Sequence, residues 1–196
     1  MQIKPKFPRF CGSVRYRNAG RIHTICGFVD TPPTIYDICD DIKIIAFYNE
    51  PEKNNSVFFS YGLSSMQKDD WIYSKPEMIL CVESLEKDWG ITMGEIIMKA
   101  SAELSFTYGD LFYWERPISH DTYMDSFFVF ANSLIDEEDS YINLADRKIH
   151  FSEMYPFYEP EKEIIYRIGV EKFFMLKEYD RFNVKRKMLD VKKFCN

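Results

Sequence analysis

The feature that most constrains the fold is a series of short runs rich in Ile, Val, Phe and Tyr, separated by turn-forming residues. Such runs predict β-strands, whereas apolar residues recurring every three or four positions predict amphipathic helices, and only two stretches show that spacing. Strands and helices do not alternate regularly, so a doubly wound parallel sheet is not expected. The pattern predicts an α+β fold with a mixed, largely antiparallel sheet packed with two main helices.

We expect about seven strands. The region 35–48 contains the clearest run, and the loop 50–55, rich in Pro and Asn, separates it from the next strand. The segment 182–189 is either an edge strand or a tail. The expected strands span 22–29, 35–48, Ser56–Tyr61, 78–82, 111–114, 127–131 and 148–155.

The first expected helix begins at Thr92, because Thr92 and Glu95 have the spacing of a capping box. The dipeptide Tyr108-Gly109 is a plausible stop, since Gly can adopt a left-handed conformation. The apolar face would comprise Ile96, Ile97, Ala100 and Leu104.

The second expected helix begins near Pro160, because proline suits the first helical turn. Two acidic residues, Glu161 and Glu163, would favour the positive end of the helix dipole. The apolar face would comprise Ile164, Ile165, Ile168 and Phe173.

The length of 196 residues fits one domain spanning 1–196, with its core at about 30–190 and an irregular or divergent extension at 1–30. We found no internal repeat or long linker. Aromatic residues make up 17% of the chain. Most of them are expected in the core, and the rest could form an aromatic surface patch.

The net charge of −6 is unevenly distributed. Residues 1–27 carry +6 and residues 181–196 carry +5, which leaves −17 on residues 28–180. An acidic body disfavours nucleic acid as a partner and favours a basic protein. The alternative is that the acidic surface only aids solubility.

Five cysteines, an odd number without a C-x-x-C pair, predict neither a disulfide framework nor a zinc site. A reducing, cytoplasmic location is the simplest expectation. The N-terminus lacks the apolar segment of a signal peptide, and no stretch is apolar enough to span a bilayer, so we expect no membrane association.

The sequence offers little chemistry. The three histidines have no metal-ligand spacing and are interpreted as structural. Residues 60–66 resemble a nucleophile elbow. That motif requires a glycine two residues after the serine, but Met66 stands two residues after Ser64. No P-loop or dinucleotide fingerprint is present. We therefore expect no catalytic residue, no cofactor and no metal, and predict that the chain is not an enzyme.

The candidate partner-binding residues form two groups. The densest acidic run is expected in an exposed loop, either as a docking site for Lys and Arg of a partner or as a solvated turn: Asp136, Glu137, Glu138 and Asp139. The second group consists of amphipathic aromatics near turns, with core or rim packing as the alternative: Tyr108, Tyr113, Trp114 and Tyr123.

The order of several segments resembles the Suppressor of fused domain family over roughly residues 35–190. Leu63 stands where that family often has Met, and Met78 where it often has Leu. The segments are 41–45 (DIKII), 58–66 (FFSYGLSSM), 76–82 (PEMILCV), 117–118 (PI), 151–156 (FSEMYP), 159–163 (EPEKE) and 180–186 (DRFNVKR).

This resemblance implies an α+β domain without cofactor or catalytic residues. The animal member restrains a transcription factor in Hedgehog signalling and carries a second domain for which this chain has no room. Stand-alone bacterial members look like immunity proteins encoded beside secreted polymorphic toxins, and this chain resembles those. A cognate toxin domain, possibly basic, is therefore the expected partner. The alternative is a regulatory module that binds a flexible peptide, for example by strand addition at a sheet edge.

Overall fold

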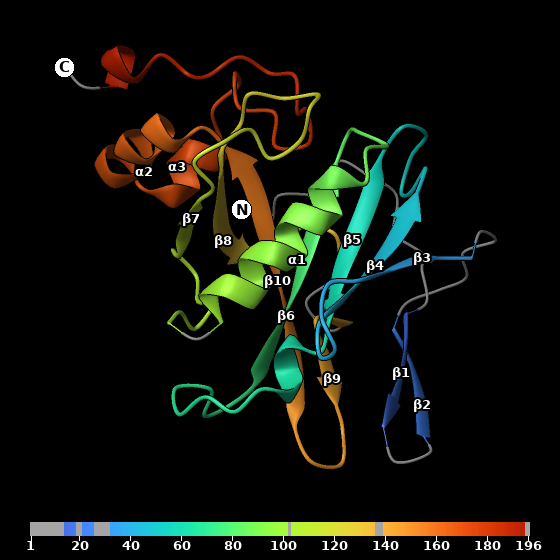
Figure 1. The fold of residues 1–196 in the computed structure, drawn as a ribbon. Helices are drawn as coiled ribbons and strands as arrows, with labels where there is room; N and C mark the ends of the chain where they lie inside the picture. The colour runs from blue at the N-terminus through green and yellow to red at the C-terminus, as the bar shows by residue number, and fades with distance from the viewer. Residues whose placement is uncertain (1–13, 19–20, 26–31, 102, 136–138, 195–196) are drawn as a thin grey trace.

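The computed structural model describes residues 14–18, 21–25, 32–101, 103–135 and 139–194. An eight-stranded sheet has the order β3-β4-β5-β6-β10-β8-β7, and β9 also pairs with β10 (Figure 1). A separate hairpin consists of β1 (Val14–Asn18) and β2 (Arg21–Ile25). The sheet strands are β3 (Thr34–Asp37), β4 (Lys43–Tyr48), β5 (Ser56–Tyr61), β6 (Lys75–Val82), β7 (Leu111–Tyr113), β8 (Ser126–Ala131), β9 (Tyr141–Asn143) and β10 (Lys148–Phe157).

All neighbouring strands of the sheet are antiparallel except β6 and β10, which run parallel at its centre. The predicted α+β class with a mixed, largely antiparallel sheet is therefore confirmed. The chain enters β10 only after it has made α1 (Asp88–Ala100), β7, β8 and β9. A connection of this length is what a parallel pair requires.

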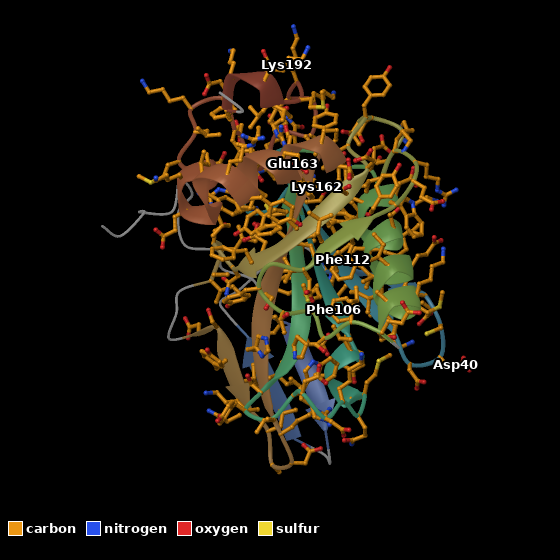
Figure 2. The ribbon with its side chains drawn as sticks, turned by 90° about the vertical axis from the view of Figure 1, so that its left-hand side faces the viewer. Asp40, Phe106, Phe112, Lys162, Glu163 and Lys192 are labelled. Atoms are coloured by element: carbon orange, nitrogen blue, oxygen red, sulfur yellow. The ribbon has the colours of Figure 1, made fainter. Side chains whose placement is uncertain are left out.

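Helix α1 crosses one face of the sheet diagonally (Figure 1). Beneath it lie the buried side chains of Ile44 and Phe58, which share a hydrophobic cluster with Trp89 and Met93 of the helix. Gly90 permits this close approach, because a Cβ there would lie 2.4 Å from a ring carbon of Phe58. The same cluster contains Phe106 and Phe112, whose rings stack with centroids 5.2 Å apart (Figure 2).

A second cluster contains Phe59 and Phe151, whose rings meet edge to face at 6.0 Å. The loop residue Ile135, Ile142 of β9 and the C-terminal Phe182 belong to this cluster. Val57 and Phe59 belong to this second cluster, whereas Phe58 between them belongs to the first, so alternate side chains of β5 enter different clusters. This alternation is the period expected of a strand that is buried on both faces.

The third cluster joins the sheet to two short helices, α2 (Lys162–Ile168) and α3 (Val170–Phe174). Ile164 and Phe173 of these helices pack in one cluster with Phe128 and Phe157 of the strands. In Figure 2, Lys162 and Glu163 mark the start of α2 at the upper end of the molecule. The expected apolar face is partly confirmed, since Ile168 is only half-buried.

The predicted start of the first helix was wrong. Helix α1 begins at Asp88, and Thr92 lies inside it, where its hydroxyl donates a hydrogen bond to the carbonyl of Ile118 instead of capping the helix. The expected end was also wrong, because α1 stops at Ala100 and Leu104 lies beyond it.

The second predicted helix begins close to the expected place but is interrupted. Pro160 lies in a 3-10 turn, Glu159–Glu161, and Gly169 separates α2 from α3. Both predicted acids stand at the start of α2, but Glu161, directly before the helix, is completely buried, whereas Glu163 is exposed. The strands β1 and β9 were not predicted, and the segment 182–189 forms no strand.

The turn after β5 depends on Gly62, which has φ +110°. A Cβ at this position would lie 1.8 Å from the backbone oxygen of Asp41. The buried carboxylate of Glu77 accepts hydrogen bonds from the backbone amides of Gly62 and Ser64, at 3.1 and 3.0 Å. The segment 58–66 is therefore held by contacts inside the fold, which supports a structural interpretation of its motif.

Candidate functional site

One concave site is an acidic hollow of about 520 Å³ at the end of the sheet where β6 leads into α1. Four separate segments meet there: the β4–β5 turn, the β6–α1 connection, the loop before β8 and the C-terminal segment. Three of its lining residues are acidic and one is basic. The lining consists of Asn54, Glu83, Ser84, Leu85, Glu86, Asp121, Asn183 and Lys185.

Hydrogen bonds fix these segments to one another. The backbone amide of Glu83 donates to the carbonyl of Phe182 at 2.8 Å, and Ser56 Oγ donates to the carbonyl of Ser84 at 2.6 Å. The hydroxyl of Thr122 donates to the carbonyl of Val184 at 2.7 Å. The hollow is therefore largely preformed, which lowers the cost of ordering it when a partner binds.

Asp121 is a carboxylate of the hollow that side-chain hydrogen bonds hold in place. Its Oδ2 accepts a hydrogen bond from Ser84 Oγ at 2.6 Å, and its Oδ1 accepts one from Trp89 Nε1 at 3.1 Å. Burial opposes ionisation of Asp121, but these hydrogen bonds outweigh burial and hold its pKa below the ordinary value. Asp121 is therefore a fixed negative charge at neutral pH.

His120 lies next to Asp121 and between two further acids. Its Nδ1 is 3.2 Å from Asp88 Oδ2, and its Nε2 is 3.4 Å from Glu86 Oε1. The hydrogen bond with Asp88 and the charge of Glu86 raise the pKa of His120. The structural interpretation of this histidine is supported, since protonation would let it connect both acids at the start of α1.

The hollow has the electrostatics of a receptor for cationic side chains. Carboxylates that converge on a preformed concave surface favour the guanidinium of Arg or the ammonium of Lys. Among the described residues, no group of three or more His, Cys, Asp or Glu side chains could hold a metal ion. Burial raises the pKa of the Cys81 thiol well above its ordinary value, which does not suit a nucleophile.

The predicted acidic docking run falls mostly outside the part of the chain that the structure describes. Asp136, Glu137 and Glu138 lie outside the described residues, whereas Asp139 is described and exposed. The proposal that this run docks onto a basic partner therefore stays a prediction.

Three of the four predicted aromatics are exposed. Tyr108 and Tyr113 are about half exposed, and Tyr123 is 83% exposed. Tyr108 packs on Phe130 with ring centroids 5.4 Å apart. Among the described residues, no ring contact joins Tyr108, Tyr113, Trp114 and Tyr123 to one another, so they do not form a single aromatic cluster.

Trp114 is half-buried and differs from the other three. Lys99 Nζ lies 4.3 Å from the centre of its ring, and the guanidinium carbon of Arg116 lies 5.2 Å from it. These cation–π contacts give Trp114 a role in attaching the end of α1 to the β7 region. Rim packing, the structural alternative for this residue, is therefore favoured.

Sequence reasoning missed the hollow itself. The run Glu83-Ser-Leu-Glu86, between a buried strand and a helix, was the available signal. Nothing in the sequence indicated that Asp121 and Lys185 would join it, because these residues are distant in the chain and meet only through the fold.

The chain is similar to proteins of one known family. The family model described as Suppressor of fused protein (SUFU) matches residues 39–187. Comparison with curated protein sequences finds no match. A search of the described residues finds no helix long and apolar enough to cross a membrane.

Several solved structures share the fold. A Suppressor of fused homologue from Neisseria gonorrhoeae FA 1090 has a TM-score of 0.61 at 14% identity, over 79% of this chain and 83% of that chain. Drosophila Suppressor of Fused has a TM-score of 0.57 at 14% identity, over 77% of this chain but only 43% of that chain. A chain of the Sufu-Fu complex has a TM-score of 0.55 at 13% identity, over 77% of this chain and 78% of that chain.

Proposed function

Because the chain belongs to the Suppressor of fused family, we propose that it is a non-catalytic protein-binding domain that neutralises a cognate bacterial toxin by direct contact. The observation that carries the proposal is the acidic hollow, a preformed concave surface with three carboxylates and one lysine. Such a surface recognises a basic partner and needs no catalytic group. Toxins that act on nucleic acid present basic surfaces, since binding phosphates requires them.

One comparison supports a binding role. One similar structure is a chain of the Sufu-Fu complex, which is an assembly of two proteins. The similar homologue from Neisseria gonorrhoeae is matched over 83% of its length, whereas this chain spans less than half of the Drosophila protein.

A co-expression rescue tests the proposal. The gene next to the one that encodes this chain would be expressed in a bacterial host alone, together with the wild-type chain, and together with a chain carrying Glu83→Lys and Glu86→Lys. We expect the neighbour to kill alone, the wild type to restore growth in a stable complex, and the charge-reversed chain to protect less well. A toxic neighbour that the wild type neither binds nor silences would overturn the proposal.

The second candidate function is the binding of a flexible peptide by strand addition. The specific observation in its favour is β3, which forms one end of the sheet order and exposes Thr34, Ile35 and Asp37. An exposed sheet edge offers backbone donors and acceptors to an added strand. Hydrogen exchange separates the two candidates. A bound peptide would protect amides of β3, whereas a folded toxin seated on the hollow would protect residues 83–86.

A further inference from the structure

The loop before β6 carries two adjacent large hydrophobic side chains that the fold leaves in water. Ile72 is 76% exposed and Tyr73 is 90% exposed. We call these two residues the apolar tip. Single exposed hydrophobics are ordinary on protein surfaces, but adjacent ones at the end of a loop form a contiguous apolar surface that calls for an explanation.

The loop that presents the apolar tip is firmly attached. Trp71, the residue before the tip, is buried in the main core, and its Nε1 donates to the carbonyl of Ser105 at 2.9 Å. Lys68 Nζ donates a hydrogen bond to the carbonyl of Leu104 at 2.7 Å, and the hydroxyl of Ser105 donates one to the carboxylate of Asp70. The apolar tip is therefore exposed although the loop that carries it is packed against the fold.

A rigid loop with exposed anchors is suited to binding. Little conformational entropy is lost when a preformed loop enters a partner, so most of the apolar burial contributes to affinity. Tyrosine combines a large apolar ring with a polar end and is enriched among the residues that dominate protein interfaces.

The charges around the apolar tip indicate which kind of partner it fits. Asp69 and Asp70 lie in this loop and Glu103 in the segment to which it is attached, and all three are exposed. The cations of the loop, Lys68 and Lys75, are half-buried and donate hydrogen bonds to backbone carbonyls. These carboxylates repel the phosphates of nucleic acids and of anionic lipids. They suit the basic rim of an apolar pocket on a protein.

We propose that the apolar tip, Ile72 with Tyr73, is an anchor that inserts into an apolar, basic-rimmed pocket of the folded toxin domain. The inference rests on the proposed function and names a second contact for it. The hollow follows the end of β6, at Glu83, whereas the tip precedes its start, at Lys75, so the two surfaces lie at opposite ends of this strand (Figure 1). A partner that reached both would lie along the length of β6.

The test compares a tip variant with a control variant and uses the product of the neighbouring gene as the probe. The tip variant carries Ile72→Ser and Tyr73→Ser, and the control carries Tyr166→Ser, which removes a 72% exposed tyrosine from α2. All these side chains are exposed, so each variant is expected to melt at the temperature of the wild type. We expect the dissociation constant to rise at least about 30-fold for the tip variant and less than about 3-fold for the control.

Each outcome decides the proposal. If the wild type binds the neighbour and the tip variant binds it equally well, the apolar tip is not the anchor, while the proposed function stands. If the wild type does not bind or silence a toxic neighbour, the proposed function fails and the anchor fails with it. If sedimentation shows a dimer of the wild type alone that the tip variant abolishes, the tip serves a second copy of this chain, and the proposal is overturned.

Discussion

The guanidinium of Arg186 and the carboxylate of Glu161 form two parallel hydrogen bonds, Nη1 to Oε1 and Nη2 to Oε2, each 2.6 Å long. Both side chains are almost completely buried. Glu161 Oε1 also accepts a hydrogen bond from the backbone amide of Leu189 at 2.8 Å. A single carboxylate thus holds the C-terminal segment against the start of α2.

Replacing Arg186 by Met should destabilise the fold by about 3–5 kcal/mol, because it leaves the carboxylate of Glu161 buried without its counter-charge. The free energy of unfolding from urea titration measures the effect. The neighbouring substitution Lys185→Met removes an exposed charge and should change stability by less than about 0.5 kcal/mol. A loss below about 1 kcal/mol for Arg186→Met would mean that the pair contributes little.

Gly62→Ala should cost far more than Gly109→Ala, although both glycines have a positive φ. At Gly109 the added methyl group meets open space, so only backbone strain of about 1 kcal/mol is expected. At Gly62 it also meets the backbone oxygen of Asp41, which should add at least about 2 kcal/mol. Thermal unfolding of the two variants side by side makes the comparison, and equal losses would contradict the structure.

The buried carboxyl of Glu153 should make the fold less stable as the pH rises. Burial raises the pKa of Glu153 above its ordinary value of 4.5. The folded state therefore holds this proton more tightly than the unfolded state, so stability is lost as the pH rises from 4.5 through the folded pKa.

Glu153→Gln tests this prediction, because the amide oxygen can still accept the hydrogen bonds of Ser133 and Tyr155. The free energy of unfolding would be measured from pH 4.5 to 8. We expect the variant to lose less stability than the wild type over this range. The exposed Glu163→Gln serves as the control and should follow the wild type. Parallel profiles for the Glu153 variant and the wild type would exclude a buried carboxyl with a raised pKa at this position.

Reversing the charge of the hollow should slow association with a basic partner. With Glu83→Lys and Glu86→Lys, the association rate with the proposed basic partner, the product of the neighbouring gene, is expected to fall about 10-fold at low salt, because electrostatic steering is lost. Stopped-flow binding at several salt concentrations measures the rate. The control reverses two exposed acids elsewhere, Glu163→Lys and Glu171→Lys. Equal rates for both pairs would show that the hollow has no special part in the encounter.

Local patterns predicted much of the sheet. The strand Ser56–Tyr61 was predicted with the bounds that the structure has, because a polar loop and Gly62 mark its two ends in the sequence. The family resemblance, expected at about 35–190, agrees with the matched range 39–187. Helix α1 was found but misplaced, since the hydroxyl of Thr92 has its partner in Ile118, a contact that no local spacing reveals.

The site was less predictable, because it depends on contacts between distant segments. Glu161 was predicted only as an acid near a helix start, and only the fold supplies Arg186 as its buried partner. Asp121 similarly becomes part of the hollow through Ser84 and Trp89. Exposed aromatics such as Tyr123 and Tyr73 look alike in the sequence, and the packing of neighbours such as Trp71 distinguishes them only in the structure.

The parallel pairing of β6 with β10 also determines when the centre of the sheet can form during synthesis. Lys75 pairs with Ile149, so the centre of the sheet closes only after the ribosome has made about three-quarters of the chain. Until then the hairpins β3 to β6 end in an unpaired, largely apolar strand, which is the kind of edge that aggregates. Closure over such a sequence distance is slow compared with hairpin formation. A chain that folds in this order completes the central strand pair of its sheet only late in its own synthesis.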